Sequence, residues 1–316
     1  MTTTLLVPLD GSAKDERALP AAEALADLAG ANLHLIRVLD LPLETLSPRA
    51  RVMGGADEAH ARRHDMEVSV RGIADRIVAD TGRSITAEVA EGADVAGVLI
   101  KRAAEQRPLF VVMATRAAGA IGRALRGSVA DRVVRESPRP VVVVPPGADD
   151  ISGKQIQLRR VLVPLDGSAL SFRAVEYLLA LPRAGDLEYV LLRAIPPGPG
   201  AAAAGRIIPV WAEVMATAEA NLGATDLGQA RADAEQGLEA AAARLRAAGA
   251  KIVEVRVVED ADPAAAIAAA VRTELADFVA MSTRGASGLK RFVLGSVAER
   301  VVRESDVPVL LVTPHD

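Results

Sequence analysis

The residues with the clearest chemical potential form one glycine-punctuated stretch near the C-terminus. Its sequence is Met281-Ser282-Thr283-Arg284-Gly285-Ala286-Ser287-Gly288-Leu289-Lys290-Arg291-Phe292-Val293-Leu294-Gly295-Ser296. An apolar run at 278–281 precedes it and predicts a buried strand, and a helical pattern at 297–304 follows it. Glycines let backbone N–H groups approach a ligand closely, and the first turn of a helix adds free N–H groups and a positive dipole end. These features predict an anion site of the kind that binds phosphate.

A structural interpretation competes with this one. Ser296 and Glu299 have the S-x-x-E spacing of a capping box, which would start the helix whatever the loop binds. Because loose glycine motifs also occur in loops that bind nothing, the stretch alone leaves both interpretations open. A second signal must come from the rest of the chain.

Composition narrows the classes of function. A length of 316 residues predicts about two domains at ~150 residues each. Aromatic residues make up 2% of the chain and the net charge is −4, so we expect no nucleic-acid partner. The chain has no cysteine, which excludes disulfides, thiol catalysis and cysteine-based metal sites. Neither a signal peptide nor an apolar run of ~18 residues is visible, so we expect a cytoplasmic protein with no membrane partner.

Two phrases occur twice, which indicates an internal duplication. Val-Pro-Leu-Asp-Gly-Ser surrounds Asp10 and again Asp166, an offset of 156. Gly-Ser-Val-Ala, an acidic residue and Arg-Val-Val-Arg-Glu-Ser begin at Gly127 and again at Gly295, an offset of 168. The second half therefore holds 12 extra residues (168 − 156), which we place mostly in the Pro/Gly-rich segment 196–205. We set the two domains at 1–147 and 158–316.

Each half alternates apolar strand patterns with helical patterns, which predicts an α/β fold. We expect two tandem doubly wound (Rossmann-like) domains, each a five-stranded parallel sheet with helices on both faces. Pro20 should kink the first helix or mark its true start. In the first half the predicted strands are 5–9, 33–39, 85–89, 109–113 and 141–144, and the predicted helices are 14–29, 57–80, 95–105 and 129–136. In the second half the predicted strands are 161–165, 188–194, 252–258, 278–282 and 309–313, and the predicted helices are 169–181, 230–248, 263–275 and 297–304.

Strand order decides whether the two repeated phrases meet. Doubly wound sheets commonly have the order 2-1-3-4-5 or 3-2-1-4-5. In the second order, strands one and four are neighbours at the topological switch point, and ligands bind beyond their carboxyl ends. The Asp166-Gly167-Ser168 turn and the loop 285–296 would then line one crevice. Asp-Gly after a strand is also ordinary turn chemistry, and an aspartate can cap the next helix.

These phrases, together with Val-Pro-Val-Leu-Leu-Val at 307–312, make essentially the whole chain resemble the universal stress protein family in its tandem two-domain form. ATP-binding members of that family resemble one another in a G-x2-G-x9-G-[S/T] loop. Nine residues separate Gly285 from Gly295, which matches the x9 spacing, while Ser282 stands at the first glycine of the pattern. The resemblance implies ATP as the ligand. A bound triphosphate usually brings a divalent ion, and the sequence leaves open whether Mg²⁺ accompanies it.

The resemblance also implies site residues in the second half. The aspartate after the first strand, Asp166, would face the ribose or adenine, and Ala194 at the end of the second strand would line the adenine pocket. The loop and the helix start would surround the phosphates. We therefore expect a nucleotide site made of Pro164, Asp166, Gly167, Ser168, Ala194, Ser282, Arg284, Gly285, Gly288, Gly295, Ser296 and Val297.

The first half departs further from the pattern. Its weaker equivalents of the site are Asp10, Val38, Gly127 and Ser128, and alanine stands at positions 114, 117 and 120. A methyl group at position 117 would crowd a phosphate, and alanine disfavours a positive φ. We predict that the second half is the better nucleotide site and that the first is weak, empty or chiefly structural.

Other candidate residues carry weaker signals. His60 and His64 would share a helix face, but the two arginines between them favour a solvated surface, so we predict no metal site. Arg116 and Arg284 follow the fourth strand of each half, where either a phosphate or a nearby carboxylate would suit a guanidinium group. No Ser/His/Asp set can be assembled from motifs, so no catalytic residue is assigned.

Three functions follow from these patterns. The first is an ATP-binding stress or regulatory protein that acts through nucleotide occupancy and unknown protein partners, since no general base aimed at water is visible. The second is a slow ATPase or ATP-dependent transferase that uses Asp166 with a divalent ion. The third is a nucleotide-free dimerisation or scaffold protein. The resemblance and the exposed edge of an apolar fifth strand imply that the halves pair through their fifth strands, with a homodimer of chains left open.

Overall fold

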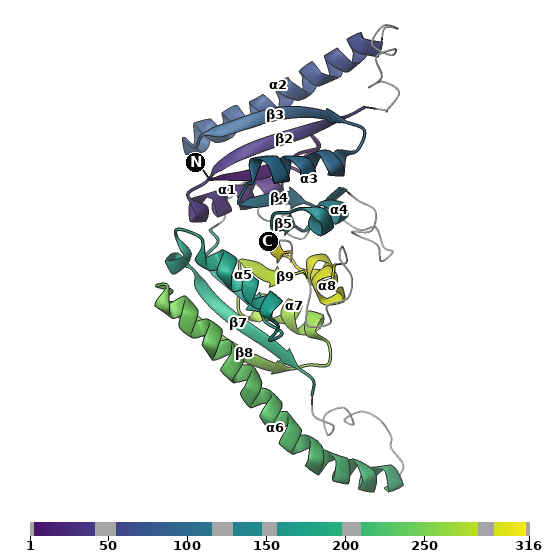
Figure 1. The fold of residues 1–316 in the computed structure, drawn as a ribbon, viewed down its shortest axis with the longest axis vertical. Helices are drawn as coiled ribbons and strands as arrows, with labels where there is room; N and C mark the ends of the chain where they lie inside the picture. The colour runs from purple at the N-terminus through teal and green to yellow at the C-terminus, as the bar shows by residue number, and fades with distance from the viewer. Residues whose placement is uncertain are drawn as a thin grey trace.

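One ten-stranded sheet runs through the whole molecule (Figure 1). The computed structural model describes residues 3–41, 55–115, 129–146, 157–197, 210–283 and 294–313, without the side chains of 55–58 and 210–226. The strand order is β3-β2-β1-β4-β5-β10-β9-β6-β7-β8, so each half contributes five strands in the order 3-2-1-4-5. Within each half all strand pairs are parallel. The predicted α/β class and the second of the two predicted strand orders are confirmed.

The helices and strands follow the predicted alternation closely. The first half contains β1 (Thr4–Pro8), α1 (Ala18–Ala29), β2 (Asn32–Asp40), α2 (Gly55–Thr81), β3 (Ile85–Gly92), α3 (Val95–Gln106), β4 (Phe110–Ala114), α4 (Val129–Glu136) and β5 (Val141–Val144). The second half contains β6 (Arg160–Pro164), α5 (Ala169–Leu179), the short 3₁₀ turn η3 (Ala184–Asp186), β7 (Glu188–Ile195), α6 (Val210–Ala247), β8 (Ile252–Glu259), α7 (Pro263–Thr273), β9 (Phe278–Ser282), α8 (Ser296–Glu304) and β10 (Val309–Val312).

Two helix starts differ from the prediction. α1 begins at Ala18 rather than at residue 14, so Pro20 lies in the first turn, where its missing N–H breaks no helical hydrogen bond. α6 begins at Val210, 20 residues before the predicted start at 230. The segments before α2 and α6 have equal length (41–54 and 196–209), whereas α6 has 38 residues and α2 has 27. The extra residues of the second half therefore lengthen a helix, and their expected place in segment 196–205 is wrong.

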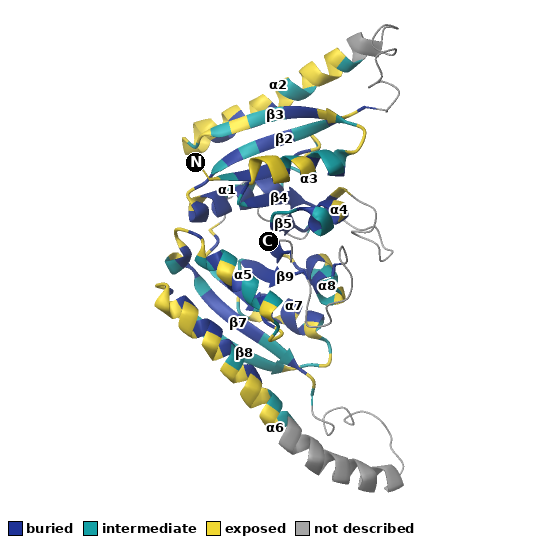
Figure 2. Ribbon diagram, viewed as in Figure 1, coloured by how far each residue is buried: buried dark blue, intermediate teal, exposed yellow. Residues whose placement is uncertain are grey.

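Helices cover both faces of the sheet, and a separate apolar cluster lies on each face (Figure 2). One cluster joins the strands to α1, α2, α5 and α6. The other joins them to α3, α4, α7 and α8. Because side chains alternate between the faces of a strand, the central strands bury both sets, and β4, β5, β9 and β10 are buried along their whole length. The wholly apolar strand patterns of the sequence follow from this arrangement.

The two halves meet at the centre of the sheet. β5 and β10 pair antiparallel, with Val143 opposite Val309, Val142 opposite Leu310 and Val141 opposite Leu311. The pairing occupies the edge that each half would otherwise expose. The expected association of the halves through their fifth strands is thus confirmed, and it relates them by an approximate twofold axis.

Candidate functional site

A pocket of about 220 Å³ opens at the carboxyl ends of β6, β7 and β9 in the second half. This is the place at which a doubly wound sheet with this strand order binds ligands. The pocket collects residues from four regions of the chain: the turn after β6, the end of β7, the start of α7, and the segment from β9 to α8. Its lining residues are Pro164, Leu165, Asp166, Ser171, Leu192, Ala194, Pro263, Ile267, Met281, Ser282, Thr283, Gly295, Ser296, Val297 and Ala298.

The turn after β6 presents Asp166 to the pocket. Its carboxylate Oδ1 accepts hydrogen bonds from the Ser168 N–H at 2.9 Å and from the Ser168 hydroxyl at 2.6 Å. Gly167 between them has φ of +84°, a conformation that L side chains rarely adopt. A Cβ there would also lie 3.0 Å from the Arg193 guanidinium. The Asp-Gly-Ser phrase therefore has a local structural role as well as a place in the pocket.

The first turn of α5 follows directly. Ser168 is the N-cap, and its Oγ accepts the N–H of Ser171 at 3.2 Å. The aspartate therefore shapes the turn, while the serine two residues later caps the helix. Ser171 is buried, donates its hydroxyl to the Ser168 carbonyl at 2.8 Å and lines the pocket. Sequence reasoning missed it, although its position one turn into the helix after the Asp-Gly-Ser phrase could have signalled it.

α8 begins at the pocket with a glycine as its N-cap. Gly295 has no side chain to accept an N–H, and no side chain among the described residues caps this helix end. Ser296 is the first helical residue, so the predicted Ser296–Glu299 capping box is wrong, because the serine lies one position too far into the helix. The Glu299 N–H bonds the Gly295 carbonyl at 2.9 Å. Helix geometry leaves the N–H groups of the preceding turn without intrahelical partners. Three residues of that turn, Ser296, Val297 and Ala298, line the pocket.

The two ends of the glycine-rich loop are held together at the pocket. The Gly295 N–H donates to the Thr283 carbonyl at 2.8 Å, and the Thr283 N–H donates to the Val312 carbonyl at 2.9 Å. Thr283 and Leu294 are both buried. The loop therefore leaves β9 and returns to α8 at a single place, which is the pocket rim.

An ion pair joins α7 to α8 beside the pocket. Asp262 is the N-cap of α7, and its Oδ1 accepts the Ala265 N–H at 3.2 Å. Its other oxygen pairs with Arg300, whose Nε also contacts Glu304 at 2.8 Å. The Ala265 N–H and then the Arg300 guanidinium lower the pKa of Asp262. The pair links the helix that carries Pro263 and Ile267 to the helix that carries Val297.

Apolar and polar lining residues come from different elements. β7 and α7 contribute Leu192, Ala194, Pro263 and Ile267, which suit an uncharged, flat group. The turn after β6, the end of β9 and the start of α8 contribute carboxylate, hydroxyl and backbone N–H groups, which suit a sugar and an anion. The pocket thus has the mixed character that a nucleotide requires.

The structure brings together most of the sequence-predicted residues that it describes. Pro164, Asp166, Ala194, Ser282, Gly295, Ser296 and Val297 line the pocket, while Gly167 and Ser168 build the adjoining turn. Arg284, Gly285, Gly288, Arg116, Gly127 and Ser128 lie outside the described residues. The contribution of α7 was missed, because no motif in Pro263 or Ile267 indicates that its helix crosses above the ends of β6 and β7.

The equivalent place in the first half has different chemistry. Asp10 follows β1 in the same Asx turn, with Oδ1 accepting the Ser12 N–H at 2.7 Å. Asp15 stands where the second half has Ser171, and its carboxylate accepts the Asp10 N–H at 3.0 Å. The first half therefore carries a second carboxylate beside its turn. A second negative charge at this place disfavours an anionic ligand.

The structure offers neither a metal centre nor a membrane span in the parts of the chain that it describes. No three histidine, aspartate or glutamate side chains there gather closely enough to hold a metal ion. The helices in these same parts are too short or too polar to cross a bilayer.

Comparison with known proteins agrees with the duplication. The family model described as "Universal stress protein family" matches residues 1–145 and again residues 157–313. A universal stress protein of Mycolicibacterium smegmatis is 28% identical over 322 residues, covering 98% of this chain and 97% of its own length. A universal stress protein of Methanocaldococcus jannaschii is 29% identical over 156 residues, covering 49% of this chain and 81% of its own length.

The fold has a solved counterpart of the same extent. The crystal structure of a universal stress protein from Archaeoglobus fulgidus superposes with a TM-score of 0.63 at 22% identity, covering 98% of this chain and 96% of that chain. The two family matches together span nearly all of the sequence. The chain therefore belongs to the universal stress protein family, with one copy of the family's domain in each half.

Proposed function

We propose that the second half binds ATP in the pocket at the ends of β6, β7 and β9, and that occupancy of this site regulates contacts with protein partners. In this arrangement the adenine lies against the apolar residues of β7 and α7. Asp166 accepts hydrogen bonds from ribose hydroxyl groups. The phosphates lie at the start of α8.

One observation carries the proposal: the first turn of α8 lines the pocket, and no side chain among the described residues caps its N-terminus. N–H groups at such a helix end, together with the positive end of the helix dipole, stabilise phosphate oxygens. A serine or aspartate cap would compete for the same N–H groups. Thus the position of Gly295, rather than Ser296, as the N-cap of α8 supports the anion site.

A divalent ion at this site would be held chiefly by the phosphates of the nucleotide. Asp166 is the single carboxylate among the described lining residues, and it already accepts two hydrogen bonds from Ser168. Mg²⁺ in such sites keeps several water ligands and binds phosphate oxygens with one or two carboxylates. Asp166 can fill the carboxylate role, so the residues present fit a nucleotide-borne Mg²⁺.

The test is the ATP affinity of the full-length protein by calorimetry, beside Ser296→Asp and Ser128→Asp variants. An aspartate at the first helical position favours the helix dipole, so Ser296→Asp should not unfold α8. Its charge should repel the triphosphate and weaken ATP binding about tenfold or more, equivalent to ~1.4 kcal/mol. Ser128→Asp, the matched change in the first half, should alter the affinity less than twofold.

The outcomes separate the three functions. No ATP binding by the wild-type protein would contradict the proposal and favour a scaffold. Equal weakening by both variants would place nucleotide in both halves. Saturable phosphate release that disappears in Asp166→Ala would favour a slow ATPase.

A further inference from the structure

A second hollow, of about 590 Å³, lies in the first half. We name it the basal hollow. It lies at the amino ends of β1 and β4 and beside the end of α3, whereas the pocket of the second half lies at the carboxyl ends of its strands. It is lined by Thr3, Thr4, Ala104, Glu105, Gln106, Arg107, Leu109 and Arg139.

Two arginines of the basal hollow lack a carboxylate partner among the described residues. Arg107 is exposed, and no hydrogen bond or ion pair joins it to another described residue. Arg139 donates its Nε to the Pro108 carbonyl at 2.7 Å. The one acidic lining residue, Glu105, is already paired with Arg102 at 2.8 Å and with Lys101 at 3.7 Å. The hollow is therefore left with unbalanced positive charge.

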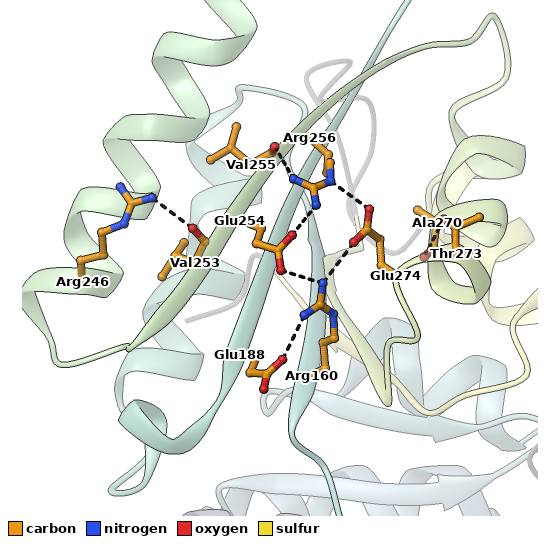
Figure 3. Close-up of polar contacts among 10 residues, drawn as sticks. All are labelled: Arg160, Glu188, Arg246, Val253, Glu254, Val255, Arg256, Ala270, Thr273 and Glu274. Carbon is orange, nitrogen blue, oxygen red and sulfur yellow. Dashed lines mark hydrogen bonds and ion pairs between the residues drawn. The ribbon is translucent and has the colours of Figure 1, made fainter.

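The matching edge of the second half is balanced instead (Figure 3). Arg160 contacts Glu188 at 3.0 Å, Glu254 at 2.9 Å and Glu274 at 3.1 Å. Arg256 contacts Glu274 at 2.9 Å and also pairs with Glu254. Two arginines there share three carboxylates, and the pKa of Glu254 is lowered chiefly by its bond to Arg160. In this network the carboxylates of the protein itself neutralise the two arginines.

The duplication shows which residues changed. By the two offsets of 156 and 168, neutral residues occupy the places of the three carboxylates in the first half, namely Asn32, Thr86 and Gln106. By the same offset, Arg107 and Arg139 correspond to Leu275 and Val307. The first half therefore lacks these three carboxylates, while its Glu88 is taken up by Arg102, and it carries arginines where the second half has apolar side chains.

The backbone conformation of the turn after α3 does not require an arginine at position 107. Arg107 has φ of +48° and Leu275 has φ of +52°, so both halves build the same left-handed turn. Since leucine occupies that turn in the second half, the turn has no need of a guanidinium group. The Arg107 side chain is thus free to serve a different role.

We propose that the basal hollow binds a small polyanion that carries phosphate groups. Guanidinium groups bind phosphate oxygens through charge-assisted, paired hydrogen bonds. Thr3 and Thr4 add hydroxyl donors at the same place. The site is distinct from the nucleotide pocket, because it lies in the other half and shares no lining residue with that pocket.

The test is a titration of full-length protein with inorganic pyrophosphate at fixed ionic strength, followed by backbone amide NMR shifts. Saturable shifts should appear at Thr3, Thr4, Arg107 and Leu109. Arg107→Gln should weaken this binding about fivefold or more, through loss of one charged donor. Arg71→Gln, which removes an exposed arginine from α2 on the other face, should leave it unchanged.

A second variant uses the residue found in the other half. Gln106→Glu introduces the carboxylate that stands at Glu274 and leaves both arginines in place, so it should also weaken binding without loss of folding. Shifts that do not saturate would overturn the proposal. So would equal effects of Arg107→Gln and Arg71→Gln, or shifts confined to Ser296 and Val297, which would assign pyrophosphate to the nucleotide pocket alone.

Discussion

The same aspartate serves in two different surroundings. Asp10 and Asp166 each follow the first strand of a half, and each accepts the N–H of a serine two residues later, at 2.7 Å and 2.9 Å. The carboxylate of Asp15 contacts the first turn, whereas the equivalent residue of the second half is Ser171, whose hydroxyl donates to the Ser168 carbonyl. A hydroxyl is neutral, whereas a carboxylate repels an anion. One residue difference thus favours the second half as the nucleotide site.

Replacing Asp166 should separate its two roles. Asp166→Asn keeps an oxygen that can accept the Ser168 N–H but removes the charge, so the melting temperature should change little. Asp166→Ala removes the acceptor as well and should weaken ATP binding about tenfold, equivalent to ~1.4 kcal/mol for a lost hydrogen bond to a charged group. Calorimetry and thermal melts measure both effects.

Asp10→Ala is the matched control for this prediction. It removes the same turn contact in the first half, so it should lower the melting temperature about as much as Asp166→Ala. The ATP affinity should stay at the wild-type value. A loss of affinity in Asp10→Ala equal to that in Asp166→Ala would show that the turn acts only through global stability.

At the scale of elements, an ion pair clamps the two helices that border each site. Asp262 caps α7 and pairs with Arg300 of α8, while Asp94 caps α3 and pairs with Arg132 of α4 at 2.7 Å. Each arginine also contacts a glutamate one turn later in its own helix. In the second half this clamp joins the helix that carries Pro263 to the helix that carries Val297, and both residues line the pocket.

Breaking the ion pair in the second half should weaken ATP binding, whereas breaking the equivalent pair in the first half should not. Asp262→Asn keeps a good N-cap for α7 but removes the charge that pairs with Arg300. We expect ATP binding to weaken by only about threefold, since an exposed ion pair contributes little free energy. Asp94→Asn should lower the melting temperature similarly and leave ATP affinity unchanged. Equal affinities in both variants and the wild type would show that the clamp does not position the pocket.

The clamps also predict a direction for acid unfolding. Hydrogen bonds and arginine contacts lower the pKa values of Asp94, Asp262 and Glu304 in the folded protein. A group with a lowered folded pKa contributes its full stability above the unfolded value, ordinarily 3.8 for aspartate and 4.5 for glutamate, and loses it as pH falls through the lower folded value. Denaturant melts should therefore show falling stability below about pH 4.5. Asp262→Asn should reduce that slope, and an unchanged slope would contradict this account.

At the scale of the molecule, the two halves form one sheet through β5 and β10. Three facing residue pairs join the strands, and every residue of both strands is buried. Either half alone would expose an apolar strand edge, which readily pairs with another chain. The contact thus holds the two halves in one body.

Cutting the linker should not separate the halves. A protease site inserted between residues 147 and 156 would break the chain, while the β5–β10 pairing and its buried side chains remain. Size-exclusion chromatography after cleavage should give one peak of unchanged size, and denaturing gels should show two fragments. Separate elution of the two fragments would contradict the prediction.

Short, strongly apolar elements could be predicted from sequence. β5 and β9 have the predicted bounds, because wholly apolar runs next to turn residues specify buried parallel strands. α6 was predicted too short, since an alanine-rich segment without a clear apolar period gives no signal for its start. Ser296 had the spacing of a cap but lies one position inside the helix, because the Gly295–Thr283 hydrogen bond sets where α8 begins. The spacing of residues in a motif cannot predict that hydrogen bond.

The sequence by itself determined the duplication and the α/β class, which follow from repeats and apolar patterns. The association of the halves was implied by the family resemblance and the exposed strand edge, and the meeting of the two phrases depended on a strand order that the sequence left open. Only the tertiary structure decided the strand order, the closing of the pocket by Pro263 and Ile267, and the hollow that Arg107 and Arg139 share. These contacts join residues that lie far apart in the chain, so their chemistry appears only when packing brings the elements together.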